Sequence, residues 1–410
     1  MERTKPKGHW FGYLGLAMAF AVPALALRFA GYDPGPLPSV LIFGGAVCAA
    51  AFLLVWAAEA AEKDISSSLA VALLALIAVM PEYAVDLYFA WAAGGNPTYT
   101  QYAAANMTGS NRLLLGFGWP VAALVYFFYS RRAGHPVSAI HLEGKARIEL
   151  AFLGLASVWC FIIPLMRRIT VWDAAVLLGI FAAYIWRVTR EPQHEPELVG
   201  TAALLGALPT RMRRAVVTSL FVLAAIFILV SAEPFAESLI EAGKILHIDE
   251  FLLVQWLAPL ASEAPEFIVA IILAARLRGG HAIGILLSSK VNQWTLLIGS
   301  LPLAYVAGGG PASGLELDAR QVEEVFLTAS QTVLGFAVLA HLHFGFGEAL
   351  ALLVLFLVQF ALPGTEGRVV LSWVYLALAV VLLWRHRRSL PAIVDAVVRP
   401  GKRIGRIRYH

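Results

Sequence analysis

The chain has 410 residues, of which 60% are hydrophobic and only 14% are charged. An ordinary soluble domain is roughly a quarter charged, so this composition excludes that class and predicts a multi-pass membrane protein whose main partner is the lipid bilayer. The formal net charge is +4, with Lys and Arg gathered between the apolar runs and at the two ends, which does not indicate a nucleic-acid partner. The two cysteines, Cys48 and Cys160, both lie in apolar runs, so we expect packing residues rather than a disulfide or metal site.

Apolar runs of about 20 residues, each able to cross a hydrocarbon core of ~30 Å, recur along the whole chain. The first run, Trp10 to Ala30, is too long for a signal peptide and lacks a clear cleavage site, so it is read as a span. We predict twelve spans: 10–30, 37–60, 66–93, 99–130, 148–166, 171–189, 215–240, 250–277, 281–306, 323–343, 347–363 and 369–385.

Positive charge predicts the orientation of these spans, because Lys and Arg accumulate in cytoplasmic loops. Basic residues precede the first span and follow the last, so we expect both termini in the cytoplasm, most simply at a prokaryotic plasma membrane. Arg167 and Arg168 fall in a loop expected outside and depart from this pattern. The predicted cytoplasmic loops are 131–147, 190–214 and the turn at Arg276 and Arg278, and the external ones include 31–36, 94–98 and the acidic segments near 241–250 and 316–324.

The longest polar connection, 190–214, divides the chain into two halves and is too short to be a soluble regulatory domain. A Pro-Glu pair lies on the third span of the first half but on the second span of the second half. The two helices therefore enter the membrane from opposite sides, which predicts an all-α protein with two inverted repeats in a ten-span core and one extra span at each end. The expected units are 1–36, 37–189, 190–214, 215–363 and 364–410.

The Pro-Glu pairs, Pro81-Glu82 and Pro265-Glu266, are the residues most suggestive of chemistry. A carboxylate at bilayer depth costs at least ~2.5 kcal/mol on insertion scales, so a chain that keeps two in matching places is expected to use them. Proline removes one helical hydrogen bond and frees carbonyl oxygens of the preceding turn. Freed carbonyls beside a carboxylate form the oxygen-rich environment that Ca²⁺ prefers.

Each Pro-Glu glutamate has a second acid on its own helix face. Asp86 follows the first glutamate by four residues, and Glu263 precedes the second by three. Facing each other across a pseudo-two-fold axis, the two helices would bring up to four carboxyls near one point. The alternative is that these acids only form ion pairs with Arg112 and Lys290.

The helix after each Pro-Glu pair carries a polar stretch, at 109–111 and at 288–290. We predict tight polar interruptions there, whose hydroxyls could bind a cation. Close helix packing through small residues is the alternative reading. Asn292 and Gln293 add amide oxygens shortly afterwards.

These motifs resemble those of the cation/calcium antiporter superfamily, the sodium/calcium exchangers and their proton-coupled relatives. Its members share two inverted repeats with Gly-Thr-Ser-x-Pro-Glu followed by Gly-Asn-x-x-Gly-Ser-Asn, and the resemblance covers roughly 66–120 and 250–305. It implies that the two repeat glutamates, Glu82 and Glu266, form the metal-binding centre, with the motif serines as further ligands. With their polar neighbours, the candidate ion-binding residues are Glu82, Glu266, Ser110, Ser289, Asp86, Glu263, Ser262, Asn106, Asn111 and Gln293.

The chain also departs from the family pattern. Ala78 and Val79 stand where the family has Thr-Ser, and Leu114 where it has an acid or amide. Several sodium-coordinating oxygens are therefore missing, which disfavours three-sodium coupling.

Lys290 replaces the Asn of the second motif. Its ammonium could act as a tethered counter-charge where a monovalent cation would bind, with Arg112 as a second charge-balancing residue. It could equally snorkel or pair with Glu263.

The leading hypothesis is an antiporter that exchanges Ca²⁺ or another cation for Na⁺ or H⁺ by alternating access, with no cofactor and a core that can work as a monomer. Proton coupling through Asp86 or Glu263 is favoured by the missing sodium ligands. One alternative is a scaffold or channel-like protein that retains the fold without exchange, which Lys290 and Leu114 would favour. A membrane-embedded enzyme has little support, since no metal-spaced His/Asp set appears.

Overall fold

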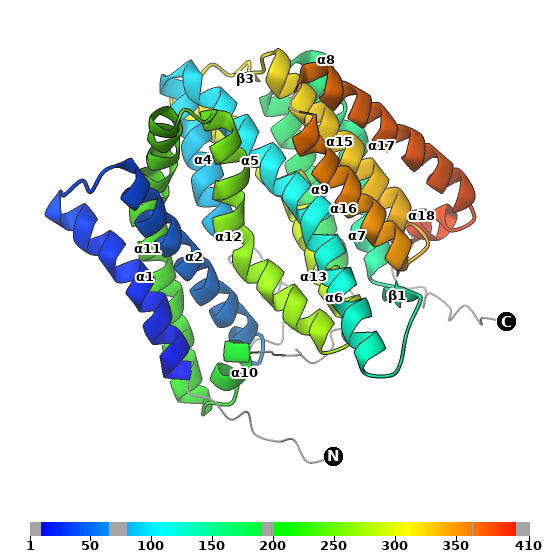
Figure 1. The fold of residues 1–410 in the computed structure, drawn as a ribbon, viewed down its shortest axis with the longest axis horizontal. Coiled ribbons are helices and arrows are strands. Elements are labelled where there is room, and N and C mark those ends of the chain that lie inside the picture. The colour runs from blue at the N-terminus through cyan, green and yellow to red at the C-terminus, as the bar shows by residue number, and fades with distance from the viewer. Residues whose placement is uncertain (1–9, 65–79, 191–197, 199, 363, 399–410) are drawn as a thin grey trace.

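The computed structural model describes residues 10–64, 80–190, 198, 200–362 and 364–398 (Figure 1). Most of the described part of each predicted span is helical, although 323–343 runs into strand β4 at His343. Residues 66–79 with Ala78 and Val79, and the terminal segments 1–9 and 399–410, lie outside the described residues. The helices are α1 (Trp10–Ala30), α2 (Pro36–Ala61), α4 (Met80–Gly95), α5 (Thr100–Leu113), α6 (Trp119–Arg132), α7 (Ala146–Cys160), α8 (Ile162–Met166), α9 (Val171–Val188), α10 (Gly200–Gly206), α11 (Thr210–Leu246), α12 (Glu250–Ala275), α13 (Gly279–Asn292), α14 (Ile298–Ala307), α15 (Ala319–Leu339), α16 (Phe346–Ala361), α17 (Thr365–Arg385) and α18 (Leu390–Val398), with a 3₁₀ turn η1 (Pro97–Tyr99).

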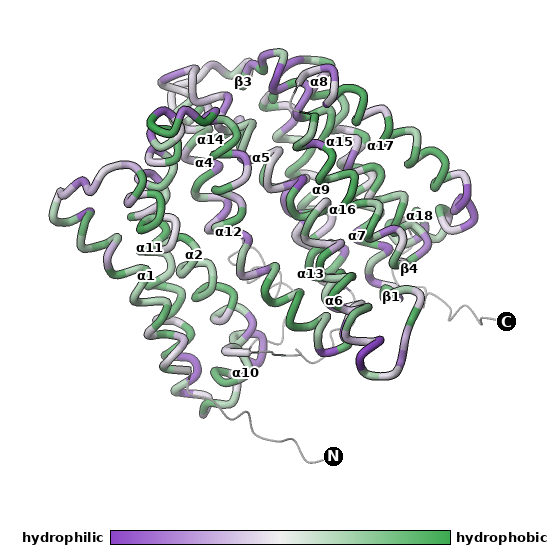
Figure 2. Tube along the Cα trace, in the orientation of Figure 1, coloured by the Kyte–Doolittle hydropathy of each residue, from purple (hydrophilic) through white to green (hydrophobic). Residues whose placement is uncertain are grey.

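Within the described ranges, nine helices are long and apolar enough to cross a membrane. Figure 2 shows hydrophobic colour along most of the helices and hydrophilic colour mainly in the loops at the two ends of the bundle. A helix satisfies its own backbone hydrogen bonds, which lipid cannot do, so apolar helices of this length are the expected elements of a multi-pass membrane protein.

Close packing of small side chains holds the bundle together. Helix α2 lies along α11 and is flanked by α1, and α12 packs against α5 and α13. The buried positions of α2 are rich in alanine, including Ala46, Ala50, Ala57 and Ala60. Small residues let helix backbones approach closely where lipid supplies no hydrophobic driving force between helices.

Two short antiparallel strand pairs connect the halves at different ends of the bundle (Figure 1). Strand β1 (Ala139–His141) pairs with β4 (His343–Gly345), and β2 (Arg168–Ile169) pairs with β3 (Leu315–Glu316). We call the end with β1 and the α12–α13 turn the predicted cytoplasmic end, and the end with β2 and β3 the predicted external end. Arg168 Nη2 lies 3.9 Å from Glu316 Oε1, which partly balances the basic pair that departs from the charge rule.

The structure corrects the predicted interruptions at 109–111 and 288–290. Helices α5 and α13 run through both stretches, because the backbone finds no better partners than its own in an apolar surrounding. The irregularity follows as a π-helical segment, η2 (Leu114–Gly118) and η3 (Gln293–Leu297), each starting four residues after the motif serine. Single-turn π segments inside helices are frequent at functional sites.

Both motif prolines lie in helices. Pro265 lies inside α12, which continues from Glu250 to Ala275, so the proline does not end that helix. Pro81 is the second residue of the described part of α4.

Candidate functional site

Helices α4 and α12 bring the four predicted carboxyls into one buried region. Glu82 is 4% exposed, Asp86 0% and Glu263 2%, while Glu266 is partly buried. The Glu82 carboxyl interacts electrostatically with those of Asp86 and Glu266, and the Glu263 carboxyl with those of Glu82 and Glu266. The two inverted repeats therefore each contribute two acids to the same neighbourhood.

The motif helices supply hydrogen-bond donors to these acids. Ser289 Oγ of α13 donates to Glu266 Oε2 at 2.5 Å, and Gln293 Nε2 of η3 donates to Glu263 Oε1 at 3.0 Å. Ser110 of α5 and Gln293 also lie beside the Glu82 carboxyl. Both π-helical segments thus begin next to the acid cluster.

The remaining predicted ligands lie at the edge of this group. Asn106 is the polar neighbour of Asp86. Ser262 Oγ donates to the Ala258 carbonyl at 3.2 Å, one turn back in α12, so its hydrogen bond stays within its own helix.

Among the described residues, several buried oxygens of the cluster have no hydrogen-bond donor of ordinary geometry. Buried polar atoms are normally paired, so a group of unpaired ones in a single region calls for an explanation such as an ion or a proton. These six atoms are Glu82 Oε1, Asp86 Oδ1 and Oδ2, Asn106 Oδ1, Glu263 Oε2 and Gln293 Oε1.

Lys290 is completely buried and connects the two repeats. Its Nζ donates to the side-chain oxygen of Asn111 at 2.7 Å and to the Asn111 carbonyl at 3.1 Å. It also lies 4.7 Å from the ring centroid of Trp294, a cation–π geometry. Its charge interacts with Glu263 and Glu82. Of the sequence readings, snorkelling to the surface is excluded by this burial.

Arg112 does not belong to the acid cluster. Its Nη2 lies 2.5 Å from Glu324 Oε2 of α15, and its Nη1 donates to Gln359 Oε1 at 3.1 Å. Gln255 Nε2 donates to the same glutamate at 3.1 Å. The alternative that Arg112 neutralises the motif acids by a direct ion pair is therefore wrong.

Gly109 of the first motif is required by packing. A Cβ there would lie 1.8 Å from the Gln255 carbonyl oxygen of α12, so α5 and α12 approach each other with no room for a side chain. In the second motif Gly284 has no heavy atom within 4 Å of the corresponding Cβ position. The close approach of α5 to α12 is what brings Ser110 next to the carboxyls.

Sequence reasoning did not single out Glu149 of α7, which is 3% exposed. Ser288 Oγ of α13 donates to Glu149 Oε1 at 2.6 Å, and Tyr184 OH of α9 lies 3.5 Å from the same Ser288 hydroxyl. The available signal was a glutamate at the start of the apolar span 148–166.

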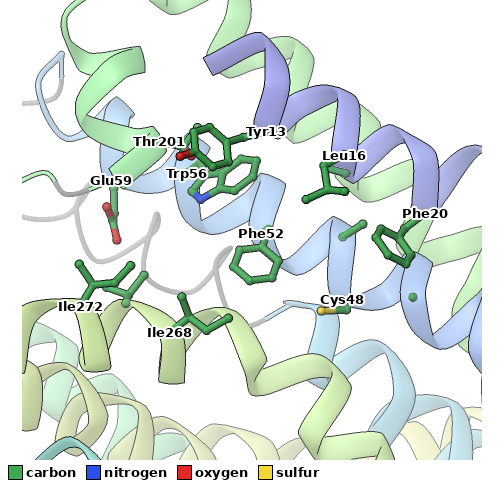
Figure 3. Close-up of a pocket in the computed structure, with 15 residues that line it drawn as sticks. Tyr13, Leu16, Phe20, Cys48, Phe52, Trp56, Glu59, Thr201, Ile268 and Ile272 are labelled. Carbon is green, nitrogen blue, oxygen red and sulfur yellow. The ribbon is translucent and has the colours of Figure 1, made fainter. Parts of the chain in front are cut away.

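The acids do not form a preassembled metal cage. Within the described ranges, no three His, Cys, Asp or Glu side chains are grouped in a way that could hold a metal ion. The four predicted carboxyls therefore form a loose cluster and do not meet at one point. A cavity of about 380 Å³ lies elsewhere, in an apolar groove lined by residues of α1, α2, α10 and α12 (Figure 3). A cation would have to draw the carboxylates together.

The fold and site define an ion-transport class of membrane protein, with two inverted repeats that share one buried carboxyl cluster. The family model for the sodium/calcium exchanger protein matches residues 37–190 and 216–363. The chain belongs to this family. By family it is a transporter.

Solved structures agree with that assignment. The H⁺/Ca²⁺ exchanger CAX is 42% identical, with a TM-score of 0.89 over 95% of this chain and 97% of that one. Native YfkE is 15% identical with a TM-score of 0.57, covering 89% of this chain and 99% of its own. The sodium-calcium exchanger NCX_Mj is 16% identical with a TM-score of 0.50, covering 85% and 99%. The last two likenesses concern the fold alone. Among curated proteins no match was found.

Proposed function

We propose that the chain exchanges Ca²⁺ for H⁺ across a membrane by alternating access, with Glu82 and Glu266 as the paired carboxylates that bind Ca²⁺. One observation carries the proposal: six buried oxygens without hydrogen-bond donors gather where the two repeats meet. Burying a polar oxygen without a partner costs free energy, and a bound cation or proton removes that cost. Ca²⁺ takes six to eight oxygen ligands in flexible geometry, which suits a loose set of carboxylate and amide oxygens.

Competition for the same carboxylates couples the two fluxes. A carboxylate that holds Ca²⁺ cannot be protonated, so each state of the site carries one substrate or the other. If the site switches from one side of the membrane to the other only when it holds Ca²⁺ or protons, movement of one ion drives the other in the opposite direction. The inverted repeats supply two similar half-structures that can open in turn towards each side.

Lys290 favours H⁺ over Na⁺ as the coupling ion. Its ammonium is bound by two oxygens of Asn111 and the face of Trp294, the kind of surrounding a monovalent cation would need. We assign it the role of a tethered counter-charge that takes the place of one transported ion. The 42% identity to CAX, an H⁺/Ca²⁺ exchanger, supports the same coupling.

The test is ⁴⁵Ca²⁺ uptake into proteoliposomes of the purified protein under an outward H⁺ gradient, an outward Na⁺ gradient, or neither. We expect uptake only with the H⁺ gradient. We expect Glu82→Gln and Glu266→Gln each to lower it by about 30-fold or more, since losing one partner of a buried charged interaction costs ~2–5 kcal/mol and 1.4 kcal/mol is tenfold.

Two other results would point elsewhere. Uptake driven by Na⁺ alone would replace H⁺ with Na⁺ in the proposal. Unchanged uptake by both glutamine variants, or no uptake under any gradient, would reject it in favour of a protein that keeps the fold without Ca²⁺ exchange. Lys290→Asn is the companion variant, and it should gain Na⁺-dependent uptake if the ammonium excludes a sodium ion.

A further inference from the structure

Glu149 is a buried carboxyl outside the proposed Ca²⁺ site. It is the fourth residue of α7, close to the predicted cytoplasmic end, and 3% exposed. Its Oε1 accepts a hydrogen bond from Ser288 Oγ at 2.6 Å, and Tyr184 OH donates to that serine at 3.5 Å. A short chain of hydroxyls therefore ends on this carboxyl.

Two consecutive serines of α13 connect Glu149 to the site. Ser288 donates to Glu149, while the adjacent Ser289 donates to Glu266 at 2.5 Å. Ser289 lies ten residues after the start of α13 at Gly279, about 15 Å into the bundle by helix rise. One turn of α13 thus hydrogen-bonds both to the site carboxyl of Glu266 on α12 and to the carboxyl of Glu149 on α7.

Charged residues lie near Glu149 at the predicted cytoplasmic end of the bundle. Lys145 and Glu143, in the loop before α7, are the charged groups that interact with it, and Asp395 of the neighbouring α18 is exposed. No Lys or Arg among the described residues forms an ion pair with Glu149. Within the described part of the chain, the carboxyl thus has the Ser288 hydroxyl as its hydrogen-bond partner, and Lys145 acts on it without a direct ion pair.

We propose that Glu149 is the proton carrier between the ion site and the cytoplasmic solvent. The inference rests on the proposed Ca²⁺/H⁺ exchange. When Ca²⁺ enters from the cytoplasmic side, a proton leaves the carboxyl cluster and an O–H bond forms at Glu149. That proton then passes to water at the loop of Lys145, and Glu149 returns to the carboxylate. In the opposite direction it delivers a proton to the cluster, with no net proton gained or lost by the protein.

The experiment separates proton movement from Ca²⁺ binding by comparing two fluxes in proteoliposomes. The first is Ca²⁺ uptake driven by an H⁺ gradient. The second is the exchange of ⁴⁵Ca²⁺ for unlabelled Ca²⁺ at equal pH, which needs no proton to move. The variants are Glu149→Gln, which keeps the shape, and Ser288→Ala, which removes the hydrogen bond. Ser157→Ala is the matched control, a buried serine of α7 that donates to Leu153 O of its own helix.

We expect Glu149→Gln to slow H⁺-driven uptake by about 100-fold, the low end of what a positioned proton acceptor contributes, with Ca²⁺/Ca²⁺ exchange within about twofold of wild type. Ser288→Ala should show a smaller loss of the same kind, and Ser157→Ala none. Wild-type H⁺-driven uptake in Glu149→Gln would overturn the proposal. Equal loss of both fluxes in both variants would overturn it too, since that marks a structural role. Failure of the wild-type protein to couple Ca²⁺ to H⁺ would instead reject the proposed function.

Discussion

Helix α7 of the first repeat and helix α15 of the second each carry a buried glutamate within their first two turns, Glu149 and Glu324. The two helices enter the bundle from opposite ends. Glu324 lies 2.5 Å from Arg112 and 3.6 Å from Arg368, whereas among the described residues Glu149 accepts a hydrogen bond from the Ser288 hydroxyl and has Lys145 in the adjacent loop. Removing one partner of a buried ion pair is costly, so Glu324 is tied to its arginine. The repeats share a fold, but of these two glutamates it is Glu149 that fits the proton-carrier role proposed for it.

The largest stability effect should come from breaking the Arg112–Glu324 pair. Both side chains are 2% exposed, so Arg112→Leu leaves a buried carboxylate with one partner fewer and should destabilise the protein by ~3–5 kcal/mol. The double variant Arg112→Leu/Glu324→Leu should recover much of that loss. Thermal unfolding in detergent measures both, with Glu149→Gln as the comparison from the other repeat. A larger loss in Glu149→Gln than in Arg112→Leu would contradict the difference between the repeats.

The two motif glycines should respond differently to a methyl group. Gly109→Ala pushes a Cβ against the Gln255 backbone, which cannot rotate away, so we expect ~1–3 kcal/mol of destabilisation and separation of α5 from α12. Gly284→Ala has open space and should be neutral or stabilising, because alanine favours a helix by ~1 kcal/mol. The same unfolding assay compares the pair, and equal effects would show that the close approach of α5 to α12 is not required.

The smallest expected effect concerns the ends of α2 and α11, outside the membrane spans. Arg213 binds both oxygens of Asp64 at 2.7 and 2.8 Å and holds the pKa of that carboxyl below its usual range. Because the folded pKa is depressed, the stabilisation is complete above the ordinary aspartate pKa and is lost as pH falls through the lowered value. Asp64→Asn should cost ~1 kcal/mol or less at pH 7.

The pH dependence provides the control for that variant. The difference between Asp64→Asn and wild type should vanish in strongly acidic buffer. Glu233→Gln, which breaks the Arg28–Glu233 pair whose side chains are about half exposed, should change unfolding less. A loss from Asp64→Asn that persists at low pH would mean that the ion pair is not its cause.

Much of the site could be predicted because its residues break the apolar pattern. Glu82, Asp86, Glu263 and Gln293 are polar groups within spans, and burial there has a cost that indicates use. Sequence reasoning passed over Glu149 because it is the second residue of the predicted span 148–166, and a glutamate at a span end usually faces water. Arg112 was assigned to the wrong acids, since its true partner lies more than 200 residues away along the chain.

Hydropathy and the cost of buried charge act locally, so the sequence alone predicts the membrane class, the inverted repeats and the carboxyl-bearing helices. Of the twelve predicted spans, nine helices in the described ranges are long and apolar enough to cross a membrane. Which polar side chains meet depends on how the helices pack. The Lys290–Asn111 contact, the Ser288–Glu149 bond and the Arg112–Glu324 pair each join helices that are distant in sequence. The structure also shows that the predicted helix interruptions are absent from the motifs and that a π-helical segment follows each motif instead. A helix keeps its backbone paired wherever packing permits.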